Sequence, residues 1–156
     1  MHGIGSLEDN IGVYRGEWSR GLKDGLGECM FTCGDHYVGE WKSDRQNGFG
    51  VFESSRGQGK YYGGWLNGKR HGKGELVFAN GDIYEGSFAR NKLGGYGIMT
   101  YATGQKYSGE WRNNHRNGEG QLSDGKCLYQ GYWKLGMREG FGKQVSTASP
   151  NSSTIH

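Results

Sequence analysis

The chain has 156 residues, of which 33% are apolar, and it carries a formal net charge of +3. With 32 glycines, one proline and 13% aromatic residues, it is too glycine-rich for a compact two-layer enzyme core and too aromatic for a disordered linker. No stretch approaches the roughly eighteen consecutive apolar residues of a membrane span, and three cysteines without a secretory signal favour a reducing, cytoplasmic compartment.

Residues 1–13 match the second half of a unit that recurs downstream, since Gly3-Ile4-Gly5 corresponds to Gly72-Lys73-Gly74. The leading half of that unit would lie before residue 1. We expect either a capping half-repeat or a truncated repeat. Truncation is favoured, because the ends of repeat proteins need polar caps and this segment is not an obvious one.

Six complete units follow, and each begins with Tyr-x-Gly-x-Trp, or with Phe in place of Trp in one copy. Counting the leading Tyr as position 0, glycine occupies positions 2, 11 and 13 in every copy. The predicted units span 14–36, 37–60, 61–83, 84–106, 107–128 and 129–142. Six copies in one frame predict a repeat architecture.

Each unit is predicted to form two short strands. Positions 0, 2 and 4 share one face of the first strand, and the glycine between two large rings leaves room for a neighbouring ring. Position 7 is always Gly, Asn or Asp, the residue types that tolerate a left-handed turn. A second strand places positions 13, 15 and 17 inward and ends in turn residues such as Asn80-Gly81. The predicted fold is all-β, one elongated antiparallel sheet of tandem hairpins forming a ribbon.

The last segment, residues 143–156, has no apolar pattern after Gly142 and is predicted to be a disordered tail.

The repeated Tyr-x-Gly-x-Trp and Gly-x-Gly residues resemble the MORN (membrane occupation and recognition nexus) repeat family over residues 14–142. The resemblance implies a gently twisted, grooved β-ribbon. It also implies an architectural role in scaffolds, adaptors and cytoskeletal or ciliary assemblies.

Aromatic side chains at positions 0 and 4 are the first candidate site. They have two interpretations: packing within the sheet, or anchoring a helical or extended segment of a protein partner in a groove. Both can hold, because a one-layer sheet does not fully cover its apolar face. The candidate residues are Tyr14, Trp18, Tyr37, Trp41, Tyr61, Trp65, Tyr84, Phe88, Tyr107, Trp111, Tyr129 and Trp133.

Basic residues concentrate at positions 5 to 9, which the sequence predicts to be the loop inside each unit. Twelve of the 19 lysines and arginines lie there, together with one acid, Asp44. Stacked hairpins would align them along one edge, which is either solubilising or a contact for an acidic partner such as anionic lipid. They are Arg20, Lys23, Lys42, Arg45, Lys69, Arg70, Arg90, Lys92, Arg112, Arg116, Lys134 and Arg138.

Catalytic and cofactor motifs are missing from the sequence. The stretch 63–70 nearly spells a phosphate-binding loop, but Arg70 replaces the required Ser or Thr. Cys29 and Cys33 have no second pair for zinc, and the histidines occupy unrelated positions in the repeat. We therefore expect no enzyme activity, no cofactor and no metal. The absence of RNP, KH and zinc motifs also speaks against nucleic acid as a partner.

Two functions of different kinds remain. The first is a non-catalytic scaffold or adaptor that binds protein partners through an aromatic-lined groove, in cytoskeletal, ciliary or membrane-peripheral assemblies. The alternative is peripheral binding to anionic phospholipids through the basic edge. Strand edges near Tyr14 and Gly142 also allow homo-association.

Overall fold

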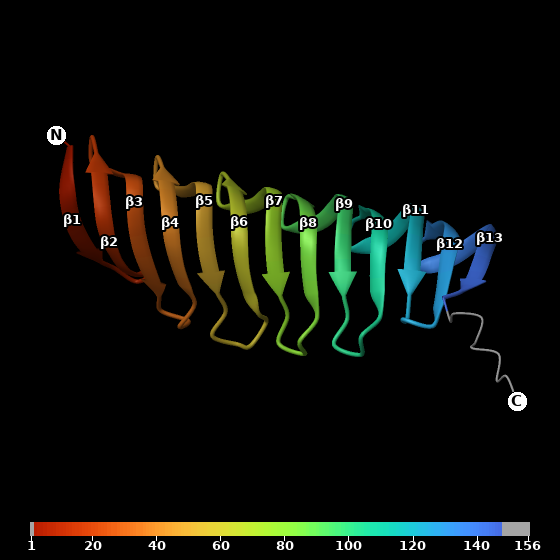
Figure 1. Cartoon of the computed structure of the whole chain (residues 1–156). Coiled ribbons are helices and arrows are strands. Elements are labelled where there is room, and N and C mark those ends of the chain that lie inside the picture. Colours follow the sequence, from red (N-terminus) through yellow and green to blue (C-terminus); the bar gives the residue numbers. More distant parts are fainter. Residues whose placement is uncertain (1, 148–156) are drawn as a thin grey trace, which may run out of the picture.

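The structure, a computed structural model, describes residues 2–147, and these form one sheet of thirteen strands whose spatial order follows the chain (Figure 1). All neighbouring strands are antiparallel. The strands are β1 (His2–Glu8), β2 (Gly12–Ser19), β3 (Leu22–Phe31), β4 (His36–Lys42), β5 (Arg45–Glu53), β6 (Lys60–Leu66), β7 (Lys69–Val77), β8 (Ile83–Ala89), β9 (Lys92–Thr100), β10 (Lys106–Arg112), β11 (His115–Ser123), β12 (Cys127–Lys134) and β13 (Met137–Ser146). Within residues 2–147 there is no helix, so the predicted all-β ribbon is confirmed.

A tight turn joins the two strands of each unit. Both central residues, positions 6 and 7, have positive φ, as at Asn113 (48°) and Asn114 (70°). This is the turn that matches the twist of a hairpin, and it confirms the turn predicted from the residue types at position 7. Figure 1 shows these turns along one long edge of the ribbon and the connections between units along the other.

Neighbouring turns are also bonded to one another, which the sequence did not indicate. From the second unit on, the amide of position 7 donates to the carbonyl of position 9 in the preceding unit, as in Asn91 N to Arg70 O at 3.0 Å. Where position 7 is Asp or Asn, the side chain can accept a second bond, as from Leu93 N to Asn114 Oδ1 at 2.9 Å. These bonds couple the position of each unit to the next.

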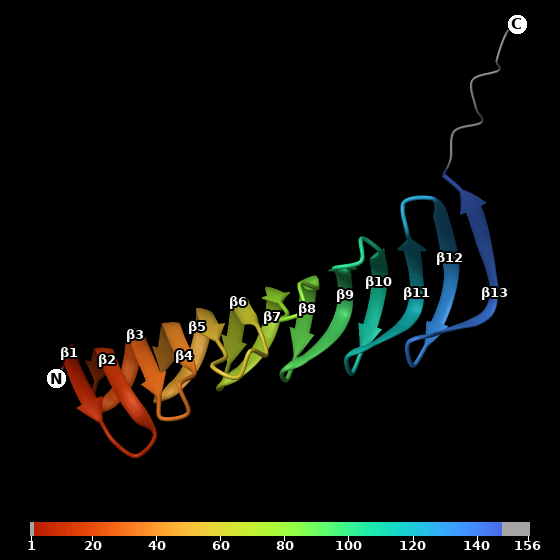
Figure 2. The same cartoon turned by 90° about the horizontal axis from the view of Figure 1, so that it is seen from below.

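Each unit bends sharply at its Gly-x-Gly. The register shifts there, so that three residues of the second strand face one residue of the first, as between Gly63 and Trp65 of β6. The glycine at position 11 has positive φ in all six units, for example 77° at Gly72 and 91° at Gly118. Figure 2 shows the result in β9, β11 and β13, whose strands curve over their length.

The leading Tyr of each unit packs on two glycines. In the second unit a methyl group at Gly50 would lie 2.5 Å from Cζ of Tyr37, and one at Gly39 would lie 2.7 Å from its Oη. The Tyr37 ring is 0% exposed and its hydroxyl donates to Glu40 O at 2.9 Å. Position 13 is therefore glycine because the ring occupies the space of a Cβ, and position 2 because the backbone of the second strand and the Tyr hydroxyl both do.

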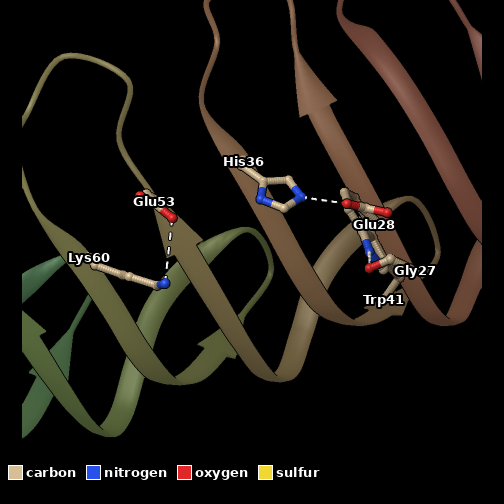
Figure 3. A network of polar contacts seen from close by, with 6 residues as sticks. All are labelled: Gly27, Glu28, His36, Trp41, Glu53 and Lys60. Atoms are coloured by element: carbon tan, nitrogen blue, oxygen red, sulfur yellow. Dashed lines mark hydrogen bonds and ion pairs between the residues drawn. The ribbon is translucent and has the colours of Figure 1, made fainter.

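Tyrosines and tryptophans alternate in one row along the sheet, which we call the ring ladder. Each Tyr makes an edge-to-face contact with the position 4 ring of its own unit, and the first five also contact that of the next, with centroids 4.9 to 5.6 Å apart. Tryptophan adds a hydrogen bond to the preceding unit, as from Trp41 Nε1 to Gly27 O at 3.1 Å (Figure 3). Phe88 lacks the N–H that makes this bond.

The structure differs from the sequence prediction in two places. Strand β13 continues to Ser146, four residues past the predicted boundary, because Lys143 pairs with Gln130 and Val145 with Leu128. Residues 148–156 of the predicted tail lie outside the described residues. The glutamates at position 3 bind backbone at the bend, which the sequence prediction did not include: Leu26 N donates to Glu17 Oε2 at 2.8 Å, and Phe49 N donates to Glu40 Oε2.

Candidate functional site

The face of the sheet that carries the ring ladder, here called the ladder face, contains a depression of about 440 Å³. It spans the width of the ribbon, from the turn residues Asn91 and Asn114 to Gln58 and Asp82 near the opposite edge. Its apolar lining consists of Leu76, Phe78, Phe88, Leu93, Met99, Tyr101 and Trp111.

The twelve aromatic side chains predicted to anchor a partner all belong to the ring ladder. Eleven of them are at most 8% exposed, and Trp18 is partly buried. They form the floor of the ladder face, and a partner would meet chiefly the side chains above them. A direct binding role for these rings stays a prediction, and their packing role follows from their burial.

Four of the twelve predicted basic residues lie on the ladder face. The side chain at position 9 pairs with position 4 in the hairpin, as Arg70 does with Trp65, and so shares the face of the rings. We call Lys23, Arg70, Arg116 and Arg138 the ladder-face cations. Each stands over two or three rings: Lys23 over Tyr14 and Trp41, Arg70 over Tyr61 and Phe88, Arg116 over Tyr101, Tyr107 and Trp133, and Arg138 over Tyr129 and Trp133, at 4.0 to 5.9 Å from the centroids.

The other eight basic residues are exposed along the edge of the intra-unit turns, and we call them the turn-edge bases. They are Arg20, Lys42, Arg45, Lys69, Arg90, Lys92, Arg112 and Lys134. The sequence predicts all twelve on one edge, because it predicts a loop over positions 5 to 9, and this is wrong for position 9. The turn itself contains only two residues, so position 9 already belongs to the second strand.

The ladder-face cations have no carboxylate partner within residues 2–147. The ion pairs found there join His36 to Glu28, Lys60 to Glu53 and Lys134 to Glu139, the first two drawn in Figure 3. Cations held over rings without a counter-charge favour an anionic ligand on this face.

Two of these cations are held in place by hydrogen bonds. Arg70 Nη2 donates to Asn91 O at 2.9 Å, and Nε of Arg116 donates to the hydroxyl of Tyr101 at 3.1 Å. Desolvation lowers the pKa of the Arg70 guanidinium from its ordinary value, although an arginine stays charged near neutral pH. Both guanidinium groups are thus ordered before any ligand arrives.

Position 9 is not a cation in two units, where it is Gln46 and Leu93. Leu93 is 5% exposed and lines the depression on the ladder face. The sequence contains this exception, but its position on the ladder face follows only from the pairing of position 9 with position 4.

The opposite face has a depression of its own, of about 470 Å³, beside Tyr96, Tyr132 and Phe141. These rings are 56%, 51% and 104% exposed. Tyr96 and Phe141 occupy position 12, which is also apolar in two other units, and Tyr132 is the one aromatic residue at position 3, so these rings follow the repeat only in part. Glu119 is the one charged residue that lines this depression, so it lacks the positive charge of the ladder face.

No group of three or more His, Cys, Asp or Glu side chains that could hold a metal ion occurs in residues 2–147. Cys29 is buried, and burial raises the pKa of its thiol. Over the same residues the structure has no helix that could cross a membrane.

Comparison with known proteins gives a family match over most of the chain. A model of the MORN repeat matches residues 14–35, 37–59, 61–83, 84–106, 107–126 and 129–147. These units agree with the predicted ones to within a few residues, except that the last extends to the end of the described chain.

Among known proteins, the chain is similar to alsin and to a second MORN protein. Rat alsin is 32% identical over 153 residues, and human alsin is 31% identical over the same length; each match covers 90% of this chain. MORN repeat-containing protein 3 of Xenopus laevis is 49% identical over 41 residues, a quarter of this chain. The chain spans only 6% of the length of alsin and 17% of that of the Xenopus protein.

Proposed function

The chain belongs to the MORN repeat family, and we propose that it is a non-catalytic scaffold or adaptor that binds protein partners along its ladder face. The observation that carries the proposal is the set of cations held over a buried aromatic floor without carboxylate partners in residues 2–147.

Repetition supplies the mechanism. Units that follow one another along a sheet present similar contacts at a regular spacing, so a long partner engages several weak sites at once. Hydrogen bonds between neighbouring turns and the ring ladder keep those sites at fixed distances, which lowers the entropy cost of binding. We place this scaffold in cytoskeletal, ciliary or membrane-peripheral assemblies.

The test is affinity capture from cell lysate with two variants of matched charge. In the ladder-face variant Arg70→Gln and Arg116→Gln remove two cations. Glutamine is chosen because Gln46 is the native residue at position 9 of the second unit. In the edge variant Lys42→Gln and Arg112→Gln remove two exposed turn-edge bases. We expect proteins captured by the wild-type chain to be lost with the ladder-face variant and kept with the edge variant. Equal capture by all three would contradict the proposal.

A second candidate function is peripheral binding to anionic phospholipids, favoured by the eight turn-edge bases that are exposed along one long edge. A basic residue close to an anionic membrane contributes about 1 kcal/mol, so several together suffice for attachment. Co-sedimentation with phosphatidylserine vesicles at physiological salt tests this function. Loss of binding in the edge variant alone would favour it, and an absence of binding by the wild-type chain would exclude it.

A further inference from the structure

We infer that the ladder face between β7 and β11 accepts an acidic segment in an extended, polyproline-II-like conformation. One apolar side chain of this segment enters the depression beside Leu93, and a carboxylate binds each of Arg70 and Arg116. The inference rests on the proposed function and specifies the partner.

The apolar part of the site is confined to the fourth unit. Position 9 is Arg70 in the third unit, Leu93 in the fourth and Arg116 in the fifth. A cation at this position covers the ring floor, whereas Leu93 lies 5% exposed and leaves the depression open above Leu76 and Met99. An apolar side chain from a partner finds here a concave surface of carbon atoms between two charged groups.

The two flanking arginines suit carboxylates. A guanidinium presents a planar fork of donors that matches a carboxylate in two parallel bonds. Arg70 lines the depression and keeps donors beyond the one bonded to Asn91 O. Arg116 borders it beside Tyr101, to whose hydroxyl its Nε and Nη2 both donate, and it keeps the outer N–H groups of its guanidinium for a ligand. The nearest acid in the lining is Asp82, whose carboxylate is already bonded to Ala102 N and to the Asn80 amide group. With Arg70 and Arg116 beside this one acid, the site carries a net positive charge.

Spacing along the ribbon selects the conformation of the partner. Arg70, Leu93 and Arg116 lie on β7, β9 and β11, so consecutive members are two strands apart, about 9.6 Å at the usual strand separation. A polyproline-II helix repeats every three residues, about 9.3 Å, and brings residues i, i+3 and i+6 to one side. An α-helix brings residues i and i+7 to one side at about 10.5 Å, and the mismatch accumulates over two units. The segment therefore has the pattern acid-x-x-apolar-x-x-acid.

The probe is a fluorescein-labelled peptide with the core Asp-Pro-Ser-Leu-Pro-Ser-Asp, measured by fluorescence anisotropy with the full chain. Three altered peptides accompany it: one with both Asp changed to Lys, one with Leu changed to Ser, and one with an extra Ser on each side of Leu. We expect the first peptide to bind and each altered peptide to bind at least tenfold more weakly. The Lys peptide loses the charge-assisted bonds, the Ser peptide loses the buried methyl groups of Leu, and the longer peptide loses the spacing that matches the strands.

Protein variants locate the binding on the chain. Arg70→Gln and Arg116→Gln should each weaken binding of the first peptide about tenfold. Leu93→Arg places at this position the residue found in the neighbouring units, so the fold tolerates it, and it should weaken binding about tenfold by filling the depression. The edge variant Lys42→Gln with Arg112→Gln should stay within about twofold of the wild-type chain. Exchanging both charges, with Arg70→Glu and Arg116→Glu against the Lys peptide, should restore binding.

Three results would overturn the inference while leaving the proposed function intact. The first is that the peptide with extra Ser residues binds as tightly as the original peptide. The second is that a helical peptide, with its acids and Leu spaced by seven residues, binds more tightly than the original. The third is that Arg70 and Arg116 bind phosphatidylserine vesicles but not the peptide. Failure of the acidic peptide alone, with lysate proteins still lost in the ladder-face variant, also rejects only the inference. If those proteins are retained as well, both proposals fail.

Discussion

Two glycines of one strand offer a direct test of why the repeat needs glycine at fixed positions. A methyl group at Gly97 would lie 2.5 Å from Cε2 of Tyr84 and still closer to its hydroxyl. At Gly94, three residues earlier in β9, the nearest atom to such a methyl group is Ala89 Cβ at 3.8 Å, which is ordinary contact. Neither glycine has positive φ, so the two substitutions differ in the space available rather than in backbone strain.

The expected cost follows from what Tyr84 would lose. Overpacking a core costs about 1 to 3 kcal/mol, and displacing the ring also weakens the bond from its hydroxyl to Ser87 O, worth about 1 kcal/mol. Its edge-to-face contacts with Phe88 and Trp111, at 5.2 and 5.4 Å, loosen as well. We expect Gly97→Ala to lower the free energy of unfolding by about 3 kcal/mol. Gly94→Ala should leave it unchanged or raise it by up to about 1 kcal/mol, because alanine reduces the entropy of the unfolded chain.

Urea unfolding followed by tryptophan fluorescence measures both variants under the same conditions. Tyr84→Phe is a useful third variant, because it removes the hydroxyl that the new methyl group meets first. Combined with Gly97→Ala, it should cost less than the sum of the two single changes. If Gly97→Ala and Gly94→Ala unfold within about 1 kcal/mol of each other, the packing of Tyr on glycine does not explain the repeat.

Three further predictions concern the turns, the ladder and its tyrosines. Asn114→Ala should lower the free energy of unfolding by about 1 to 2 kcal/mol, and Asn114→Gly by less, as measured by thermal unfolding. Both variants lose the bond to Leu93 N, but glycine adopts the positive φ of 70° more easily than alanine. Trp111→Phe should lower the free energy of unfolding by about 2 kcal/mol by the same method, because it loses the bond to Gly97 O and leaves part of the buried space of the indole ring unfilled. Burial raises the pKa of four ladder tyrosines to about 12, above the unfolded value of about 10. Because the unfolded chain then loses its tyrosine protons at lower pH than the folded chain, the free energy of unfolding should fall as pH rises from 10 through 12. Urea midpoints between pH 9 and 12 with tyrosinate absorbance test this: the buried rings should ionise only on unfolding, and early ionisation in the folded chain would contradict it.

Most of the fold could be predicted from the sequence because the same packing and turn requirements recur in all six units. The glycine at position 13 is required by contact with the Tyr ring, and Gly, Asn or Asp at position 7 is required by positive φ. Local requirements of this kind fix residue types and therefore appear as a repeat. The extension of β13 to Ser146 could not be predicted in this way, since backbone pairing with β12 needs no particular side chains.

The candidate site was predicted less well, because its features depend on which way a side chain points. The bend and the two-residue turn bring position 9 back onto the ladder face, so Arg70 and Arg116 leave the edge that their place in the sequence suggested. Position 12 is apolar and exposed in four units, as Leu26, Phe49, Tyr96 and Phe141, but it is charged in the other two, so the sequence shows only a partial pattern there. Exceptions within a repeat, such as Leu93, are visible in the sequence, but their meaning depends on knowing which positions share a face.

The most direct test of the peptide-binding site inferred on the ladder face is a two-dimensional NMR titration of the ¹⁵N-labelled chain with the acidic peptide. Indole N–H groups of Trp65 and Trp111 bond to backbone within the ladder, and the Nε–H groups of Arg70 and Arg116 lie above it, so these signals report on this face. We predict saturable shifts of the two arginine signals and of the Leu93 amide, with the amides of Tyr96, Tyr132 and Phe141 unchanged. Shifts confined to those outer-face amides, or to the turn-edge bases, would contradict the assignment of the ladder face as the binding surface.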